Sequence, residues 1–178
     1  MNLTNTTASI LKEIILSAKE RLLLLTDTET FQKATPRKWS AKEIVGHLID
    51  SASNNHQRFV RAQSKSDMVF DGYLQAEWVR IQNYQSRSWN ELVELWAQYN
   101  LQLAHVMHFT PEDIRFRSVS KHNLHQIAFK TVAENEATSL EYFMVDYVAH
   151  LEHHLKQIFP DYEPILGAYQ NDFHKKPS

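Results

Sequence analysis

Two histidines four residues apart, His150 and His154, form the pattern in this sequence best suited to chemistry. Residues i and i+4 of an α-helix lie about 40° apart on one face, so both imidazoles can reach one ion, as in zinc proteases. A third ligand must come from elsewhere, and His47 is the candidate because it lies at the edge of another apolar helix face. Three neutral imidazoles leave coordination positions open for water or substrate, which is typical of a catalytic metal site. The alternative is that these histidines lie at the edge of the core or in solvent and bind no metal.

The other histidines fit such a site less well. His153 falls about 60° outside the buried arc of its helix. His105 and His108 stand at the end of a predicted helix, where cationic side chains stabilise the macrodipole, so we interpret them as structural. His122 and His125 have a three-residue spacing but lie where no clear helical pattern exists, and we expect them at the surface.

Polar residues near the predicted ligands are candidates for supporting roles. Asn54 and Arg58 lie along the stripe of His47, whereas Asp50 lies about 60° away, on the polar side of the helix. We expect Asp50 and Asn54 to hold an imidazole N–H or a substrate, and Arg58 to bind an anionic group. Tyr147, one turn before the histidine pair, could donate a hydrogen bond to a bound ligand. A solvated helix face is the structural alternative for the first three, and simple packing is the alternative for the Tyr147 ring.

Four amphipathic helices are predicted to position these residues. Apolar residues recur three and four positions apart in four segments, which predict helices over 6–26, 40–62, 88–110 and 138–159. The last three segments each begin with a capping box, in which Ser or Thr precedes Glu by three residues: Ser40 and Glu43, Ser88 and Glu91, Thr138 and Glu141. Trp39 and Ile44 have the positions of a hydrophobic staple around the first box.

The connections between these helices are long. Segments 63–87 and 110–137 exceed simple bundle turns, so we expect each to carry short helices or a lid. The aromatic-rich stretch 70–89 could cover a pocket or plug the core. One weakly alternating stretch, 114–119, could be extended but has no visible partner. We therefore expect a single all-α domain, a four-helix bundle over 1–178 with a core of about 6–160 and a polar C-terminal tail.

Composition excludes several classes of function. The chain of 178 residues has 3 Gly and 5 Pro, a formal charge of −2 and no basic block, so we expect long helices and no nucleic-acid partner. It has no Cys, so any thiol chemistry needs a sulfur brought by a substrate. The N-terminal segment resembles neither a signal peptide nor a membrane span, and we expect a cytoplasmic protein with no membrane partner.

Two segments of the chain resemble the DinB-like superfamily, which includes the YfiT-type metal-dependent hydrolases. They are WSAKEIVGHLIDSASNNHQRF, which contains His47, and DYVAHLEHHLKQI, which contains His150 and His154. The resemblance covers essentially the whole chain, and its specific parts are the GHL-D and HLEHHLKQI segments. It implies a four-helix bundle that binds a divalent transition metal through these three histidines, frequently as a homodimer.

The resemblance implies two possible reactions, because the superfamily includes hydrolases and S-transferases that use low-molecular-weight thiols such as bacillithiol. An open metal site suits both, since a metal lowers the pKa of bound water and of a bound thiol. Zinc or nickel is the expected metal, with iron or manganese as alternatives. We therefore expect a metal-dependent enzyme that acts on a small molecule, in the second case with a thiol cosubstrate. The alternatives are a non-catalytic stress-response protein that binds a metal or ligand, and a structural helical module.

Overall fold

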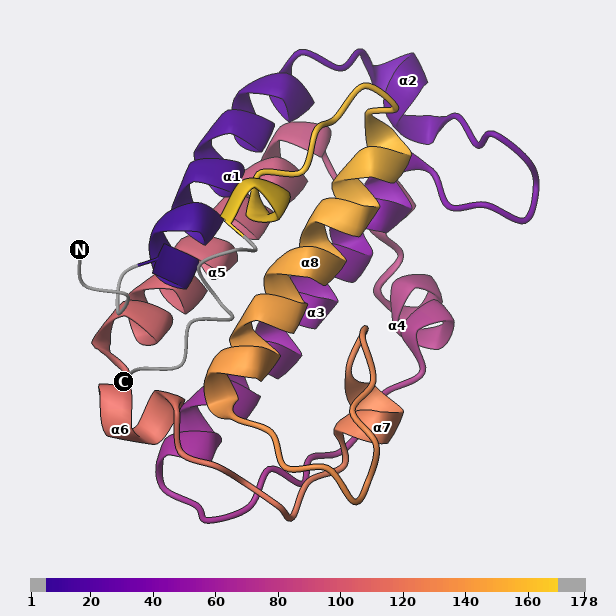
Figure 1. Cartoon of the computed structure of the whole chain (residues 1–178). Helices are drawn as coiled ribbons and strands as arrows, with labels where there is room; N and C mark the ends of the chain where they lie inside the picture. The colour runs from indigo at the N-terminus through magenta and orange to yellow at the C-terminus, as the bar shows by residue number, and fades with distance from the viewer. Residues whose placement is uncertain (1–5, 170–178) are drawn as a thin grey trace.

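Four long helices form the body of the molecule, for which a computed structural model describes residues 6–169. They are α1 (Thr6–Leu23), α3 (Ala41–Gln63), α5 (Trp89–Phe109) and α8 (Leu140–Ile158). α1 packs against α5, and α3 packs against both α5 and α8 (Figure 1). The described part of the chain has two isolated β-bridges and no strand, so the predicted all-α four-helix bundle is confirmed. The predicted polar tail, 170–178, lies outside the described residues.

The helix faces predicted from periodicity are the ones that fill the core. Fully buried side chains from all four helices meet there, among them Leu11, Ile14, Leu48, Phe59, Trp96, Leu103, Leu151 and Leu155. None of the described helices is both long and apolar enough to cross a membrane.

The helix starts follow the predicted capping boxes in part. At α3 the box is complete, because Ser40 accepts a hydrogen bond from the backbone of Glu43 and Glu43 accepts one from the backbone of Ser40. At α5 Ser88 is the N-cap, but its side chain makes no capping hydrogen bond. α1 ends earlier than predicted, because Thr26 forms a further capping box that starts the short helix α2 (Asp27–Phe31).

The capping box predicted at Thr138 is wrong, because α8 begins one residue later. Ser139 is its N-cap and accepts a hydrogen bond from the backbone N–H of Tyr142. Thr138 is instead held in an antiparallel bridge with Val119, with N···O distances of 2.8 and 3.0 Å. The weakly alternating stretch 114–119 therefore finds a partner at its end, while its start lies in α6 (Glu112–Arg115).

Glu141 is the reason that the predicted box does not form. Its carboxylate accepts a hydrogen bond from Thr7 Oγ1 at 2.5 Å and one from Arg115 Nε at 2.8 Å, all three residues being buried. This ion pair joins α8 to α6, and the hydrogen bond joins α8 to α1. A carboxylate already held by a buried guanidinium is not free to turn back to the helix N-terminus.

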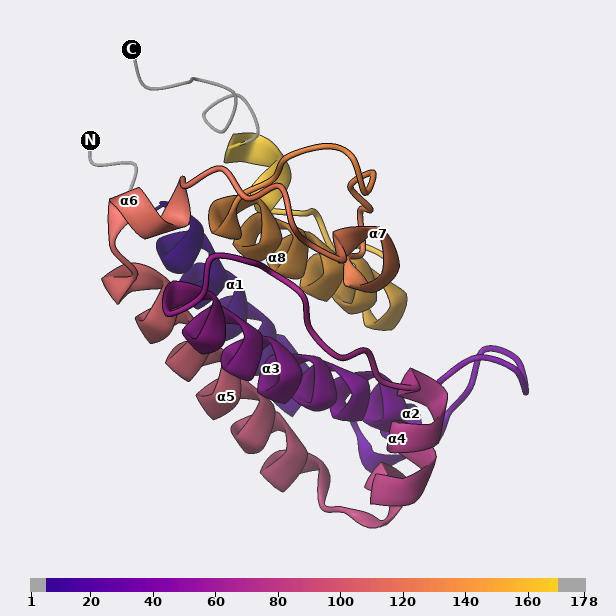
Figure 2. The same ribbon diagram turned by 90° about the horizontal axis from the view of Figure 1, so that it is seen from below.

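The two long connections carry short helices, as expected. These are α4 (Gln75–Gln82), the 3-10 helix η2 (Tyr84–Ser86), α6 (Glu112–Arg115) and α7 (Leu124–Ile127), and a 3-10 helix η3 (Leu166–Tyr169) follows α8. Figure 2 shows α4 beside α3 and α7 beside α8, on the side of the bundle where those two long helices face each other. The connections therefore cover the α3–α8 face.

His122 is buried, which corrects the expectation that it lies at the surface. It is 5% exposed, its Nδ1 accepts a hydrogen bond from the backbone of Leu124, and its Nε2–H donates to the carbonyl of Glu136 at 2.7 Å. The His122 ring therefore links two parts of the connection between α6 and α8, one near Leu124 and one near Glu136. His105 and His108 are exposed near the end of α5, where both rings contact Phe109.

Candidate metal centre

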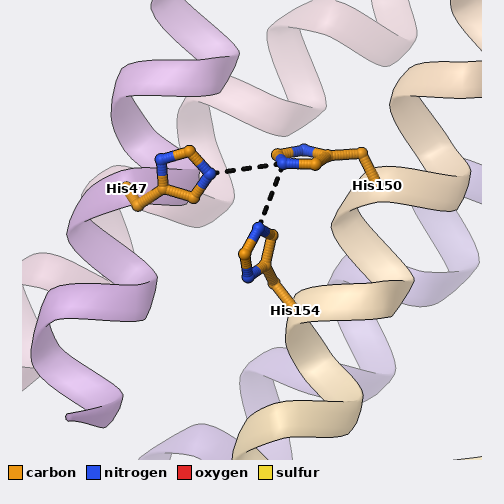
Figure 3. A group of neighbouring side chains, drawn as sticks. All are labelled: His47, His150 and His154. Atoms are coloured by element: carbon orange, nitrogen blue, oxygen red, sulfur yellow. Dashed lines mark hydrogen bonds between the residues drawn. The ribbon is translucent and has the colours of Figure 1, made fainter. Parts of the chain in front are cut away.

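Three histidine rings from two helices point at one another between α3 and α8 (Figure 3). Nε2 of His150 lies 3.3 Å from Nε2 of His47 and 3.1 Å from Nε2 of His154. His47 is fully buried and His154 is 9% exposed. In the described part of the chain, this is the group of potential ligands whose atoms all lie within 4.8 Å of one another. The structure thus brings together the three histidines selected from the sequence.

Hydrogen bonding alone does not account for this arrangement. Each imidazole nitrogen carries either one N–H or one lone pair in the ring plane, so Nε2 of His150 cannot bond well to both neighbours at once. Nitrogens bound 2.0–2.1 Å from a tetrahedral zinc ion are about 3.3 Å apart. The observed separations of 3.3 and 3.1 Å fit three lone pairs that converge on one cation.

Burial keeps the rings in the neutral form that binds a metal. Desolvation and, to a smaller extent, the neighbouring imidazoles together lower the pKa of His47 to about 3 and that of His150 to about 2. Desolvation also lowers the pKa of His154, against a smaller opposite effect of its hydrogen bond with Gln157. Metal ions compete with protons for imidazole, so these shifts favour metal binding at neutral pH.

A chain of hydrogen bonds orients His154. Its Nδ1–H donates to Oε1 of Gln157 at 3.0 Å, and the Gln157 amide donates to Nε2 of His153 at 3.0 Å. The first bond places the proton on Nδ1, which leaves the Nε2 lone pair facing the other two histidines. His153 lies outside the cluster, as the helical wheel predicted, and contributes to it through Gln157.

A close contact between Gly46 and Tyr84 fixes α3 beside His47. A Cβ atom at Gly46 would lie 2.1 Å from Cδ2 of the Tyr84 ring, so only glycine allows the ring to pack there. Tyr84 in turn donates its hydroxyl to Oδ1 of Asp50 at 2.6 Å. The aromatic stretch 70–89 therefore does plug the core at this point.

Asp50 is placed differently from the sequence expectation. It is 1% exposed rather than solvated, and its carboxylate accepts hydrogen bonds from Tyr84 and from the amide of Gln82 rather than from an imidazole. Burial raises the pKa of Asp50 to about 6. Asn54 bonds to the backbone carbonyl of Asp50 one turn earlier, at 2.9 Å. Both residues thus stabilise α3 and its contact with the 70–89 segment.

Tyr147 lines the cleft beside the histidines, and its hydroxyl has a hydrogen-bond partner within the protein. Its side chain is 2% exposed, and its hydroxyl donates to Oδ1 of Asn100 on α5 at 2.5 Å. Burial raises the pKa of this hydroxyl. The packing alternative considered for Tyr147 therefore describes its main contact.

A cleft of about 370 Å³ opens onto the histidine cluster. Its walls include Asn55, Arg58, Tyr73, Asp146, His150 and His154. Arg58 thus faces the same cavity as two of the candidate ligands. This volume lies in the range of small-molecule sites.

Two aromatic residues at the site had no functional signal in the sequence. The ring of Trp39, predicted only as part of a hydrophobic staple, lies 5.0 Å from that of His47 and stacks with His154 at 6.3 Å. The ring of Phe129 lies 5.5 Å from that of His150. Both come from segments without regular structure, so helical periodicity could not place them.

Comparisons with known proteins agree with this architecture. A model of the DinB superfamily matches residues 17–158. No curated protein matches the chain. Among solved structures, YfiT from Bacillus subtilis aligns with a TM-score of 0.72 and 17% identity, over 94% of this chain and 87% of that one. YfiT is described as "a probable metal-dependent hydrolase with an unusual four-helix bundle topology", and at this identity the likeness shows a shared fold.

Proposed function

Because the chain belongs to the DinB superfamily, we propose that it is a metal-dependent hydrolase that acts on a small molecule through His47, His150 and His154. The observation that carries the proposal is the convergence of three neutral Nε2 atoms beside a cleft of about 370 Å³. The description of YfiT supports the same reaction class. Zinc or nickel suits an all-imidazole site, and iron and manganese are the alternatives.

The three histidines would hold the ion, and the rest of the cleft would bind the substrate. When bound, such an ion supplies Lewis acidity, which polarises a carbonyl group and lowers the pKa of water. Gln157 holds the ring of His154 in the orientation for binding, and Trp39 and Phe129 limit access of solvent to the rings. Three protein ligands are the number found in catalytic rather than structural zinc sites.

Metal analysis of the purified protein tests the site. We expect about one zinc or nickel per chain in the wild type and in His105→Ala, which removes an exposed histidine on α5. We expect almost none in His150→Ala. Equal metal content in all three proteins would reject the site.

Turnover then tests the reaction. The metal-loaded protein should hydrolyse members of a panel of activated esters and amides, and both His150→Ala and removal of the metal should abolish that activity. A protein that binds metal stoichiometrically but turns over no ester, amide or thiol substrate would fit the non-catalytic alternative instead.

A second cleft favours thiol transfer as the second candidate reaction. This cleft of about 940 Å³ also reaches His154, from the side of Trp39 and Gln157. Two openings onto one site suit a reaction with two substrates, and the chain has no Cys, so the thiol must be one of them. Conjugation of a small thiol to an electrophile that requires the metal and His150 would establish the transferase.

The assembly state is a separate proposal. We propose a homodimer, as the superfamily resemblance implies, with a mass twice the 20.9 kDa of one chain. Light scattering coupled to size-exclusion chromatography measures this directly, and a mass of one chain at all concentrations would reject it.

A further inference from the structure

Arg58 is a buried cation that forms no ion pair with an acidic side chain among the described residues. It is 7% exposed, and its guanidinium donates to two neutral acceptors, the carbonyl of Asp71 at 2.7 Å and Oδ1 of Asn55 at 3.4 Å. No ion pair involves Arg58 among the described residues, whereas Arg115, which is also buried, pairs with Glu141. Burial lowers the pKa of Arg58 by more than the nearby Tyr73 and Asp71 raise it, and a buried charge without an ion pair costs free energy, so the retention of an arginine here needs a reason.

The position of Arg58 suggests that reason. Its side chain lines the cleft of about 370 Å³ that His150 and His154 also line. A guanidinium has five N–H donors in a planar fork, and the two hydrogen bonds to Asp71 and Asn55 leave others available. This fork matches the two oxygens of a carboxylate.

The acidic residues near the cleft form no ion pair with Arg58 among the described residues. Asp146 also lines the cleft, but its carboxylate accepts hydrogen bonds from the backbone N–H groups of Phe129 and Lys130 at 2.9 and 2.6 Å. Asp71 is exposed and accepts the Arg58 hydrogen bond through its backbone carbonyl, and its negative charge raises the pKa of Arg58 by less than burial lowers it. At the Arg58 position a carboxylate, with one negative charge, suits the cleft better than a phosphate dianion, because the carboxylate of Asp146 would repel a second charge placed there.

We propose that the substrate of this site carries a carboxylate that binds Arg58 while its reacting carbonyl group lies at the three histidines. The inference rests on the proposed function and names the substrate class. Arg58 follows His47 by eleven residues of α3, which corresponds to about 16 Å of helix rise. The long side chain of Arg58 makes the distance from its guanidinium to the histidines shorter than this rise. A spacer of several bonds must therefore separate the carboxylate from the reacting group.

Binding of simple carboxylates tests the inference without turnover. Isothermal titration of the zinc-loaded protein would compare dicarboxylates of increasing length, such as glutarate and adipate, with butyrate, which can only occupy one of the two positions. In the wild type we expect the best dicarboxylate to bind about 10- to 100-fold more tightly than butyrate, the effect of one charged hydrogen-bonded pair. Arg58→Gln should lose this preference.

Arg61→Gln is the matched control, because Arg61 lies three residues further along α3, is exposed, and its side chain hydrogen-bonds only to Gln57 among the described residues. It should keep the dicarboxylate preference. An unchanged preference in Arg58→Gln, or tighter binding of a phosphate monoester than of any carboxylate, would overturn the inference.

Arg58→Lys covers the case in which Arg58→Gln does not fold, since Arg58 also holds the Asp71 carbonyl. Lysine keeps the charge and one donor but not the planar fork, so metal content should stay the same while dicarboxylate affinity falls severalfold. Equal affinity in Arg58→Lys and wild type would reject recognition by the fork.

The two proposals fail in different ways. If carboxylates bind in a way that depends on Arg58 but the protein hydrolyses nothing, the proposed anion site is supported and the proposed hydrolase activity is rejected. If the protein hydrolyses neutral esters with its metal but does not prefer monoesters of succinate, glutarate or adipate, which carry a free carboxylate, the hydrolase activity is supported and the carboxylate site is rejected.

Discussion

The Nε2 atoms of His150 and His154 lie 3.1 Å apart on successive turns of α8, so they cannot both carry a proton. The proton of His154 is placed on Nδ1 by Gln157, and Nε2 of His150 has a second nitrogen, that of His47, at 3.3 Å. Helix α8 therefore provides two nitrogens to the cluster, and Gln157, which lies outside it, sets the direction of the His154 lone pair. A metal ion would satisfy all three nitrogens at once.

Gln157 should therefore control metal affinity without being a ligand. Replacing it by Leu removes the acceptor for the Nδ1–H of His154 and frees the ring to rotate. Loss of such an orienting partner typically weakens metal binding about 10- to 100-fold. Competition with a chromophoric zinc chelator measures this affinity. Lys156→Ala, which changes the exposed neighbouring residue, should bind zinc like the wild type, and an equal loss in both variants would contradict the role of Gln157.

Acid should destabilise the metal-free protein through the same histidines. In the native state burial lowers the pKa of His47 to about 3 and that of His150 to about 2, from an ordinary value of 6.5. Below pH 6.5 the unfolded chain thus binds protons that the native state does not. The free energy of unfolding therefore decreases as the pH is lowered from 6.5 towards the native pKa values of the two histidines. The limit is about 1.4 kcal/mol per pH unit for each histidine.

Urea denaturation of the metal-free protein between about pH 7.5 and about pH 4.5 checks this dependence. His150→Ala removes one of the titrating groups, so its unfolding free energy should vary less steeply with pH than that of the wild type. Burial raises the pKa of Asp50, which has the opposite effect on stability below pH 6, but Asp50 is present in both proteins and cancels in the comparison. Parallel pH profiles would contradict the neutral state of the buried rings.

The helical wheel was sufficient to select the three candidate ligands that the structure brings together, because each lies on a long regular helix whose buried face is set by its own sequence. His47 and the pair on α8 needed no information from other parts of the chain beyond the packing of two apolar faces. The same reasoning excluded His153 correctly, by an angle of about 60°.

The errors came from residues whose partners are distant in sequence. Asp50 lies on the polar side of an isolated helix, and it is buried because Tyr84, 34 residues later, packs over it. Glu141 has the spacing of a capping box, yet Arg115, 26 residues earlier, binds its carboxylate. Sequence patterns within one helix predict a capping hydrogen bond, but they contain no information on a buried ion pair that forms only in the folded structure and competes with it.

Gly46→Ala should destabilise the protein at the contact that holds α3 beside the 70–89 segment. The added methyl group would overlap the Tyr84 ring, and overpacking of this kind costs about 1–3 kcal/mol. Gly167→Ala is the control, because a Cβ there would meet nothing within 4 Å. Thermal and urea unfolding measure both variants.

Making the same substitution in a Tyr84→Ala protein shows whether the Tyr84 ring causes the loss of stability. In Tyr84→Ala the space beside Gly46 opens, so the further change Gly46→Ala should cost little or even stabilise the helix. If Gly46→Ala costs the same with and without the Tyr84 ring, the close approach is not what requires glycine.

Trp39 offers a direct optical test of where the metal binds. Its ring lies 5.0 Å from that of His47 and 6.3 Å from that of His154, so a paramagnetic ion held by these histidines should quench Trp39 fluorescence strongly. Titration with Cu²⁺ or Ni²⁺ should quench the wild type, and Trp39→Phe should lose most of that quenching. Trp78→Phe, which removes a tryptophan on α4, should retain it. Zinc has a filled d shell and should bind without quenching, so quenching that survives in Trp39→Phe would place the ion away from the three histidines.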